Sequence, residues 1–225
     1  MATKTLYPLD AMASGVNWGD MQEDSAPATA TMVTGWVVGT TTPPRYSRLR
    51  VTNESVNGNF QAASLIDAAA GPTDFGTLAD AWRSPTAYTG SFADTAWDFQ
   101  FAILRIDGTS TPDGRLRFRV WKSADGTDAT SPAELTSGTL VTTIATNVSA
   151  TPQNITASWS PGAITLTNEY LFFQGEWEIT GAGSGGAYDV HVQQDSATRI
   201  ITPNFTTGSV VGTSTALRQG RRRRR

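Results

Sequence analysis

The stretch EYLFFQGEWEIT, residues 169–180, is the strongest indicator of fold in the chain. Apolar side chains recur at every second position, and polar side chains stand between them. The apolar register consists of Leu171, Phe173, Gly175, Trp177 and Ile179, and the polar register of Gln174, Glu176 and Glu178. A period of two is typical of a β-strand with one buried and one solvent-facing side. We therefore expect a central strand of an antiparallel sheet here, with Tyr170 and Phe172 adding bulk on the second face.

The same period recurs in short segments separated by turn sequences such as Asn-Gly and Asp-Gly. Residues 96–107 place Trp97, Phe99, Phe101 and Ile103 on one face. Residues 115–122 place Leu116, Phe118 and Val120 inward and Arg115, Arg117 and Arg119 outward. Residues 61–70 have helix propensity and predict one short helix at most, or else a strand. Eight to ten such strands predict an all-β fold, an antiparallel β-sandwich of the jelly-roll or immunoglobulin-like type.

The composition fits one domain and excludes several kinds of chemistry. The chain has 225 residues, of which 39% are hydrophobic and 16% are charged. No run of apolar residues is long enough for a membrane span, and residues 1–15 do not resemble a secretory signal peptide. There is no cysteine, which excludes disulfides, thiolate metal sites and a cysteine nucleophile. The single histidine, His191, excludes a multi-histidine metal site and is expected to be a surface or packing residue.

The charge is divided unevenly along the chain. Six of the 17 basic residues lie in the last eight positions, where no acidic residue is found. These tail arginines are Arg218, Arg221, Arg222, Arg223, Arg224 and Arg225. The other 217 residues carry 11 basic and 20 acidic side chains, a net charge of −9.

This division, together with the lack of a steady periodicity in residues 1–30, predicts three parts of the chain. We expect residues 1–30 to form an extended N-terminal arm anchored by apolar side chains such as Trp18, or alternatively a first strand within the domain. Residues 31–206 are expected to form the sandwich. Residues 207–225 are expected to form a linker of small residues and an arginine-rich tail.

Acidic residues provide the candidates for catalysis or metal binding. Glu176 and Glu178 lie two apart on one strand, at a spacing that a pair of glycosidase carboxylates can have. The simpler interpretation makes them solvent-facing strand residues. Aspartates in loops could ligate calcium, although Asp-Gly is also the sequence that hairpin turns require. These aspartates are Asp107, Asp113, Asp125 and Asp128. No phosphate-binding loop or nucleophile motif is found, and we expect neither an enzyme nor a cofactor.

The aromatic and arginine patterns suggest two kinds of surface. Trp97, Trp159 and Trp177 fall on inward faces and predict core packing. Trp82 and Trp121 are the better candidates for exposure and for contact with a host glycan. The outward arginine stripe of residues 115–119 is expected to pair with acids on a neighbouring strand, with contact to a partner as the alternative.

The arginine tail has three interpretations. It could neutralise phosphates of nucleic acid, or it could dock on an acidic protein surface such as a neighbouring copy of this chain. It could also be a free solvated tail or a purification tag.

Several phrases of the sequence resemble a group of bacteriophage virion structural proteins found among head and tail genes. The resemblance covers residues 35–205. It is carried by GWVVG at 35–39, RYSRL at 45–49, AWDFQFAILR at 96–105, GRLRFRVWKS at 114–123, ASWSPGAITLTNEYLFFQGEWEITGAG at 157–183 and TRIITPNF at 198–205.

The resemblance implies an exterior or connecting β-sandwich component of a phage particle without enzymatic activity. We expect a protein that is made in the host cytoplasm, resides in the virion and contacts no membrane. It would contact other virion proteins and copies of itself through Trp18 and the tail arginines. The alternative is a carbohydrate-binding module for host attachment, using Trp82 and Trp121. A third hypothesis is a glycoside hydrolase using Glu176 and Glu178.

Overall fold

The computed structural model describes residues 2–12, 18–26, 31–38, 45–48, 60–61, 65–67, 81–107, 111, 113–124, 132–181, 188–194 and 196–208. These residues form strands and connecting turns, with no helix among them. Accordingly, none of the described residues belongs to a helix capable of spanning a membrane. The strands are β1 Thr5–Met12, β2 Trp18–Glu23, β3 Thr31–Val38, β4 Arg45–Arg48, β5 Phe60–Gln61, β6 Leu65–Asp67, β7 Ala81–Arg83, β8 Tyr88–Phe92, β9 Trp97–Asp107, β10 Asp113–Ser123, β11 Ala133–Glu134, β12 Leu140–Val141, β13 Gln153–Trp159, β14 Ile164–Gly181, β15 Tyr188–Gln194, β16 Arg199–Ile201 and β17 Phe205–Thr207.

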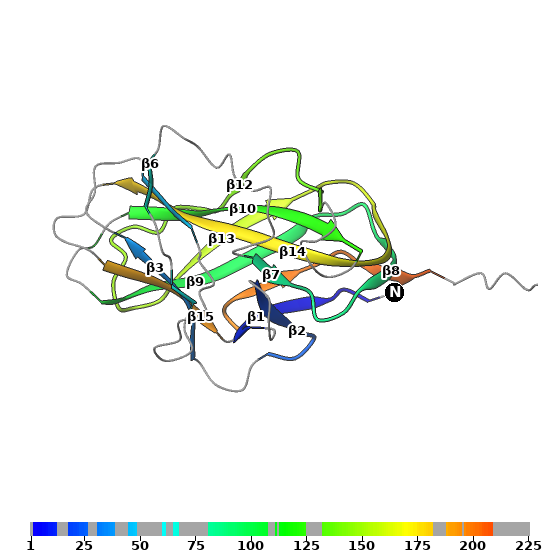
Figure 1. The fold of residues 1–225 in the computed structure, drawn as a ribbon, viewed down its shortest axis with the longest axis horizontal. Coiled ribbons are helices and arrows are strands. Elements are labelled where there is room, and N and C mark those ends of the chain that lie inside the picture. The colour runs from blue at the N-terminus through cyan, green and yellow to red at the C-terminus, as the bar shows by residue number, and fades with distance from the viewer. Residues whose placement is uncertain are drawn as a thin grey trace, which may run out of the picture.

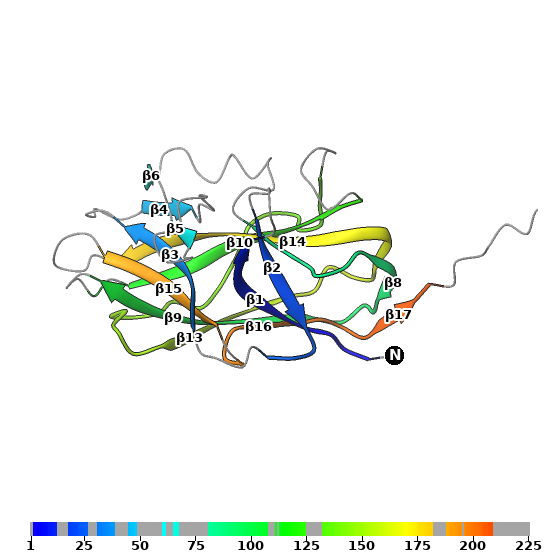
Figure 2. The same cartoon turned by 60° about the horizontal axis from the view of Figure 1, so that its bottom comes forward.

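Two facing layers of long strands confirm the predicted all-β sandwich (Figure 1). One layer contains β10 paired antiparallel with β14, and the other contains β9 paired antiparallel with β13. Figure 2 shows β10 and β14 running above β9, β13 and β16. The strands outnumber the expected eight to ten because several of them pair over only two or three residues. Residues 60–61 and 65–67 are strand, so a helix spanning 61–70 is excluded.

The two layers are joined along both edges. On one edge, β14 pairs with β7, β7 with β2, β2 with β1, β1 with β16, and β16 with β9. On the other edge, Leu140 and Val141 pair with β10, and the amide of Thr143 donates to the carbonyl of Thr156 on β13 over 2.8 Å. These pairings form a closed circuit around the core.

The N-terminal segment belongs to this circuit. Leu6 on β1 is fully buried and Met21 on β2 is 2% exposed, and both lie in the same core cluster as Trp82 and Trp97. The described part of residues 1–30 therefore corresponds to strands within the domain rather than to an extended arm. The apolar side chains of this segment did not indicate this, because Pro8 interrupts their periodicity.

The core between the layers is aromatic. Trp97 and Trp177 are fully buried and Trp159 is 8% exposed, which confirms the predicted inward positions. Phe99 of one layer meets Phe118 of the other with ring centroids 4.5 Å apart. Along β10 the buried and half-buried positions alternate as predicted, with the arginines outward.

The second face of β14 differs from the expectation. Phe172 is fully buried, and Gln174 and Glu178 are 5% and 7% exposed, so the predicted solvent-facing side is wrong at these positions. Strands flank β14 on both sides, with β10 on one side and β8, β7 and β4 on the other. Long side chains on β10, such as Arg115 beside Glu178, shield that face with their aliphatic stems.

A close backbone approach on β10 yields a stability test. A Cβ at Gly114 would overlap the Trp177 ring and lie 2.8 Å from the Glu178 carbonyl oxygen, whereas a Cβ at Gly175 would meet only the Arg117 carbonyl oxygen at 3.8 Å. We expect Gly114→Ala to lower the free energy of unfolding by about 1–3 kcal/mol, because the buried ring must shift. Gly175→Ala on the paired strand is the control, expected to change it by less than about 1 kcal/mol. Urea unfolding followed by tryptophan fluorescence measures both, and equal effects would contradict the assignment.

Candidate functional site

The outward arginines of β10 are paired within the sheet. Arg115 donates to both carboxylate oxygens of Glu178, from Nε over 2.6 Å and from Nη2 over 3.3 Å. Arg117 Nε lies 4.0 Å from the same carboxylate, and Arg119 Nη1 lies 3.1 Å from Glu134 Oε2. This confirms the predicted pairing of the stripe with acids on neighbouring strands.

The same contacts bear on the glycosidase hypothesis. That hypothesis requires an open cleft around Glu176 and Glu178, but β10 and β4 flank this part of β14 on its two sides. Glu178 is buried, and both of its oxygens accept hydrogen bonds from Arg115. The side chain of Glu176 lies outside the described residues. Glu178 therefore serves as the counter-charge of the arginine stripe.

The expected exposure of two tryptophans is wrong. Trp82 is 2% exposed and Trp121 is 8% exposed. Trp82 lies on β7 between β2 and β14 and stacks on Phe101, with ring centroids 6.4 Å apart. Trp121 lies on β10 between Phe172 and Glu134 of the adjacent strands. Neither indole presents the open face that a sugar ring would stack on.

The predicted assembly contacts fall largely outside the part of the chain that the structure describes. Trp18 begins β2 and pairs with Ala81, but its side chain is not among the described ones. The whole arginine tail also lies outside the described residues, so its predicted contact with a partner stays a prediction. This holds for each of its arginines, Arg218, Arg221, Arg222, Arg223, Arg224 and Arg225.

The candidate metal and acid–base residues are placed only in part. His191 lies in the middle of β15, but its side chain is outside the described residues, as are the loop residues Asp125 and Asp128. The carboxylate of Asp113 accepts the amide of Asn147 over 2.7 Å. Within the described parts of the chain, no three acidic or histidine side chains gather as metal ligands would.

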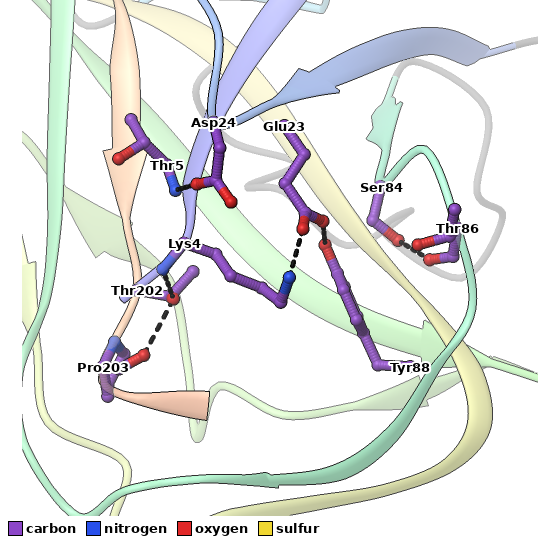
Figure 3. Close-up of polar contacts among 9 residues, drawn as sticks. All are labelled: Lys4, Thr5, Glu23, Asp24, Ser84, Thr86, Tyr88, Thr202 and Pro203. Carbon is purple, nitrogen blue, oxygen red and sulfur yellow. Dashed lines mark hydrogen bonds and ion pairs between the residues drawn. The ribbon is translucent and has the colours of Figure 1, made fainter. Parts of the chain in front are cut away.

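A polar cluster joins the start of the chain to its last strands (Figure 3). We name it the Lys4 cluster, formed by Lys4, Glu23, Tyr88, Thr202 and Phe205. The Lys4 ammonium forms an ion pair with Glu23, whose other oxygen accepts the Tyr88 hydroxyl over 2.7 Å. The Lys4 amide donates to Thr202 Oγ1 over 3.1 Å, and the Thr202 amide donates to the Lys4 carbonyl over 2.9 Å. The Lys4 ammonium also lies 5.6 Å from the centre of the Phe205 ring.

The environment of Tyr88 keeps its hydroxyl protonated. Burial, followed by the hydrogen bond to Glu23 and the negative charges of Glu23 and Asp24, raises the pKa of Tyr88 far above its ordinary value. All of the described side chains in this cluster have partners inside the fold. The cluster therefore stabilises the attachment of β1, and nothing in its geometry leaves a group directed outward for chemistry.

An open groove lies on the outer face of the layer formed by β13, β9 and β16. Its volume is about 410 Å³, and outward side chains at successive register positions form its floor. One row consists of Ser158, Asp98 and Ile201, and the next of Thr156, Gln100 and Arg199. Thr143 forms part of the rim. We take this groove as the candidate functional site.

The groove offers hydrogen-bond acceptors. Asp98 is exposed, and its carboxylate makes no hydrogen bond or ion pair with any described residue. Gln100 donates a hydrogen bond from Nε2 to the Ala197 carbonyl over 2.8 Å. Its Oε1, on the other side of the amide group, therefore points away from Ala197. Arg199 donates from Nη1 to the Ser196 carbonyl over 2.8 Å. A negative group at the Asp98 end and a positive group at the Arg199 end give the groove a polarity.

The sequence did not single out these groove residues. The one sequence feature that could have indicated them is their place in the strand pattern. Asp98 and Gln100 are the outward residues that alternate with Trp97, Phe99 and Phe101. The groove itself arises because three segments far apart in the chain pair in register.

The protein is an all-β sandwich with an open groove on one outer layer, lined by both polar and apolar side chains. Comparison of the chain with protein-family models and with curated proteins finds no match.

The Lys4 cluster predicts a specific response to alkaline pH. Unfolded tyrosine ionises near pH 10, whereas Tyr88 in the fold does not. Its contribution to stability is therefore complete below about pH 10 and is lost as the pH rises further. We expect Tyr88→Phe to cost about 1 kcal/mol at neutral pH through the lost hydrogen bond, and to make the alkaline decline in stability shallower.

Denaturant unfolding between pH 7 and pH 11 measures both effects. Tyr170→Phe is the control for losing a tyrosine hydroxyl outside the cluster. An alkaline decline of the same steepness in Tyr88→Phe and in the unmodified protein would show that Tyr88 does not contribute to it.

Proposed function

We propose that this protein is a non-enzymatic structural component of a bacteriophage particle that assembles in multiple copies. It would reside in the virion and contact copies of itself and other virion proteins. The observation that carries the proposal is the separation of charge between the body of the chain and its arginine-rich end. The resemblance of residues 35–205 to phage virion structural proteins is the reason for proposing a phage particle.

The separation of charge favours contact between copies. The first 217 residues have a net charge of −9, and the last eight contain six arginines and no acid. Opposite charges on the two parts attract one copy to another and speed their encounter. Arginine suits such contacts because its planar guanidinium donates paired hydrogen bonds to a carboxylate.

The geometry of the chain ends supports the same proposal. The Phe205 amide donates to the Ala2 carbonyl over 2.9 Å, so the beginning of the chain and β17 lie together at one end of the sandwich (Figure 2). Residues 209–225 follow β17 and number 17, which fully extended span at most about 60 Å. The tail is therefore attached at a defined end of the sandwich, and it is long enough for its arginines to contact a neighbouring copy.

Neutralising the tail tests the proposal. Replacing Arg221, Arg222, Arg223, Arg224 and Arg225 together by Gln is expected to reduce incorporation into particles at least about tenfold near 0.1 M salt. The difference should be smaller near 1 M salt, where charges are screened within about 3 Å. Quantitative mass spectrometry of purified particles measures incorporation. Sedimentation of the isolated protein measures its self-association.

The Lys variant at the same five positions is the matched control. It keeps the charge and is expected to retain most of the salt-dependent contribution, while losing the paired hydrogen bonds of the guanidinium. Absence of the protein from purified particles would overturn the phage assignment. Incorporation that is equal for the Arg and Gln forms at every salt concentration would overturn the role of the tail.

A further inference from the structure

We propose that the groove on the β13–β9–β16 layer is the docking site for the arginine-rich tail of a second copy of this chain, with a tail guanidinium on Asp98. This inference rests on the proposed function, because it names the surface to which the tail would bind during assembly.

The pairing of charges across the described surface directs the tail to Asp98. The described acidic side chains are otherwise engaged: Glu23 by Lys4, Asp24 by the Thr5 amide, Asp113 by the Asn147 amide, Glu134 by Arg119, Glu169 by Lys122 and Glu178 by Arg115. Among the described side chains, only Asp94 and Asp98 have carboxylates with no hydrogen bond or ion pair. Asp98 forms part of the groove floor, and Asp94 lies in the turn that leads into the same strand.

The chemistry of the groove fits a guanidinium. Arginine carries five N–H donors and no acceptor, so its site must supply acceptors. Asp98 supplies a carboxylate, and Ser158 beside it in register supplies a hydroxyl oxygen. Gln100, two residues further along β9 and roughly 7 Å away, supplies an amide oxygen. The half-buried side chain of Ile201 on the other side of Asp98 provides apolar surface for the methylene stem of the arginine.

The polarity of the groove orients the occupant. Arg199 lies beside Gln100, and its guanidinium is held on the Ser196 carbonyl at the far end from Asp98. A tail arginine is therefore favoured at the Asp98 end and disfavoured at the Arg199 end.

The direction of β17 indicates a second copy. Phe205 pairs with Phe92, and Thr207 pairs with Gly90, so the chain runs along β8 away from the turn that contains Asp94 and leads to Asp98. At its last described residues the chain therefore runs away from its own groove. A tail that continues in this direction meets the groove of a neighbouring copy without having to reverse, which favours docking on a second copy.

Cross-linking between two differently labelled copies tests this contact directly. The chain has no cysteine, so each introduced thiol is unique. One full-length copy carries Ser158→Cys in the groove, and the other carries Gln219→Cys in the tail. Mixed at low salt under mild oxidation, they are expected to form a disulfide-linked heterodimer. A copy with Thr167→Cys, an exposed position on β14, replaces the groove copy as the control and is expected to give little of that product.

Charge substitutions identify the carboxylate. Asp98→Asn in the groove copy is expected to reduce the heterodimer about fivefold, as for loss of one exposed ion pair. Asp113→Asn is the matched control, because it removes one surface charge while the amide oxygen can still accept the Asn147 amide, and it is expected to have no effect. Replacing Arg221 to Arg225 by Gln in the tail copy should abolish the product.

The outcomes separate the docking site from the proposed function. Equal cross-linking to Ser158→Cys and Thr167→Cys, or indifference to Asp98→Asn, would overturn the groove while tail-dependent assembly could still be measured by sedimentation. A disulfide within a single chain carrying both cysteines at high dilution would overturn docking on a second copy.

Loss of the product after nuclease treatment would show that nucleic acid bridges the copies, which also overturns the proposal. Absence of the protein from purified particles would overturn the proposed function itself, whereas self-association and incorporation that do not depend on the tail arginines would overturn the role of the tail in assembly.

Discussion

The antiparallel pairing of β10 with β14 is the interaction on which the rest of the structure depends. It runs in register from Gly114 to Ser123 and brings the inward rows of both strands onto one face of the core. Gly114 allows the closest approach, because the Trp177 ring occupies the space that a Cβ would take. The other side of β14 then pairs in turn with β8, β7 and β4, so one strand fixes the position of four others. Unpaired β14 would expose both its backbone groups and its aromatic side chains.

The second layer is attached to this pair through short strands rather than through another long interface. β7 and β2 connect β14 to β1, and β1 connects to β16 and so to β9. Each of these strand pairings involves only a few backbone pairs. Polar side chains add further contacts that reinforce these pairings. The ion pair of Lys4 with Glu23, and the hydrogen bond from Tyr88 to the same carboxylate, join β2 and β8 to the start of the chain. The half-buried charged groups at this end of the sandwich thus hold the start of the chain in place.

The features that depend on local periodicity are predictable from the sequence. The inward row of β10, the arginine row outside it and the three core tryptophans follow from a period of two within a single strand. Trp82 and Trp121 differ from the prediction for separate reasons. Trp82 lies on a strand of three residues, too short for a period to be visible, and Trp121 is on the outward register of β10 but is covered where Phe172 lies beside it. The buried state of Glu178 depends likewise on Arg115, a residue 63 positions away.

The groove could not have been predicted in this way, because its residues share no sequence pattern. Asp98, Ser158 and Ile201 become neighbours only when three strands from distant parts of the chain adopt one register. Among the described acids, charge pairing then distinguishes Asp94 and Asp98 from the others, and of these two only Asp98 lines the groove. A carboxylate that already accepts from an arginine or lysine within the fold attracts a further cation less strongly, because its charge is partly neutralised, whereas the charge of Asp98 is not offset in this way. For a chain whose body is acidic and whose end is arginine-rich, the proposed assembly is therefore better tested at the unpaired carboxylates than through the total charge.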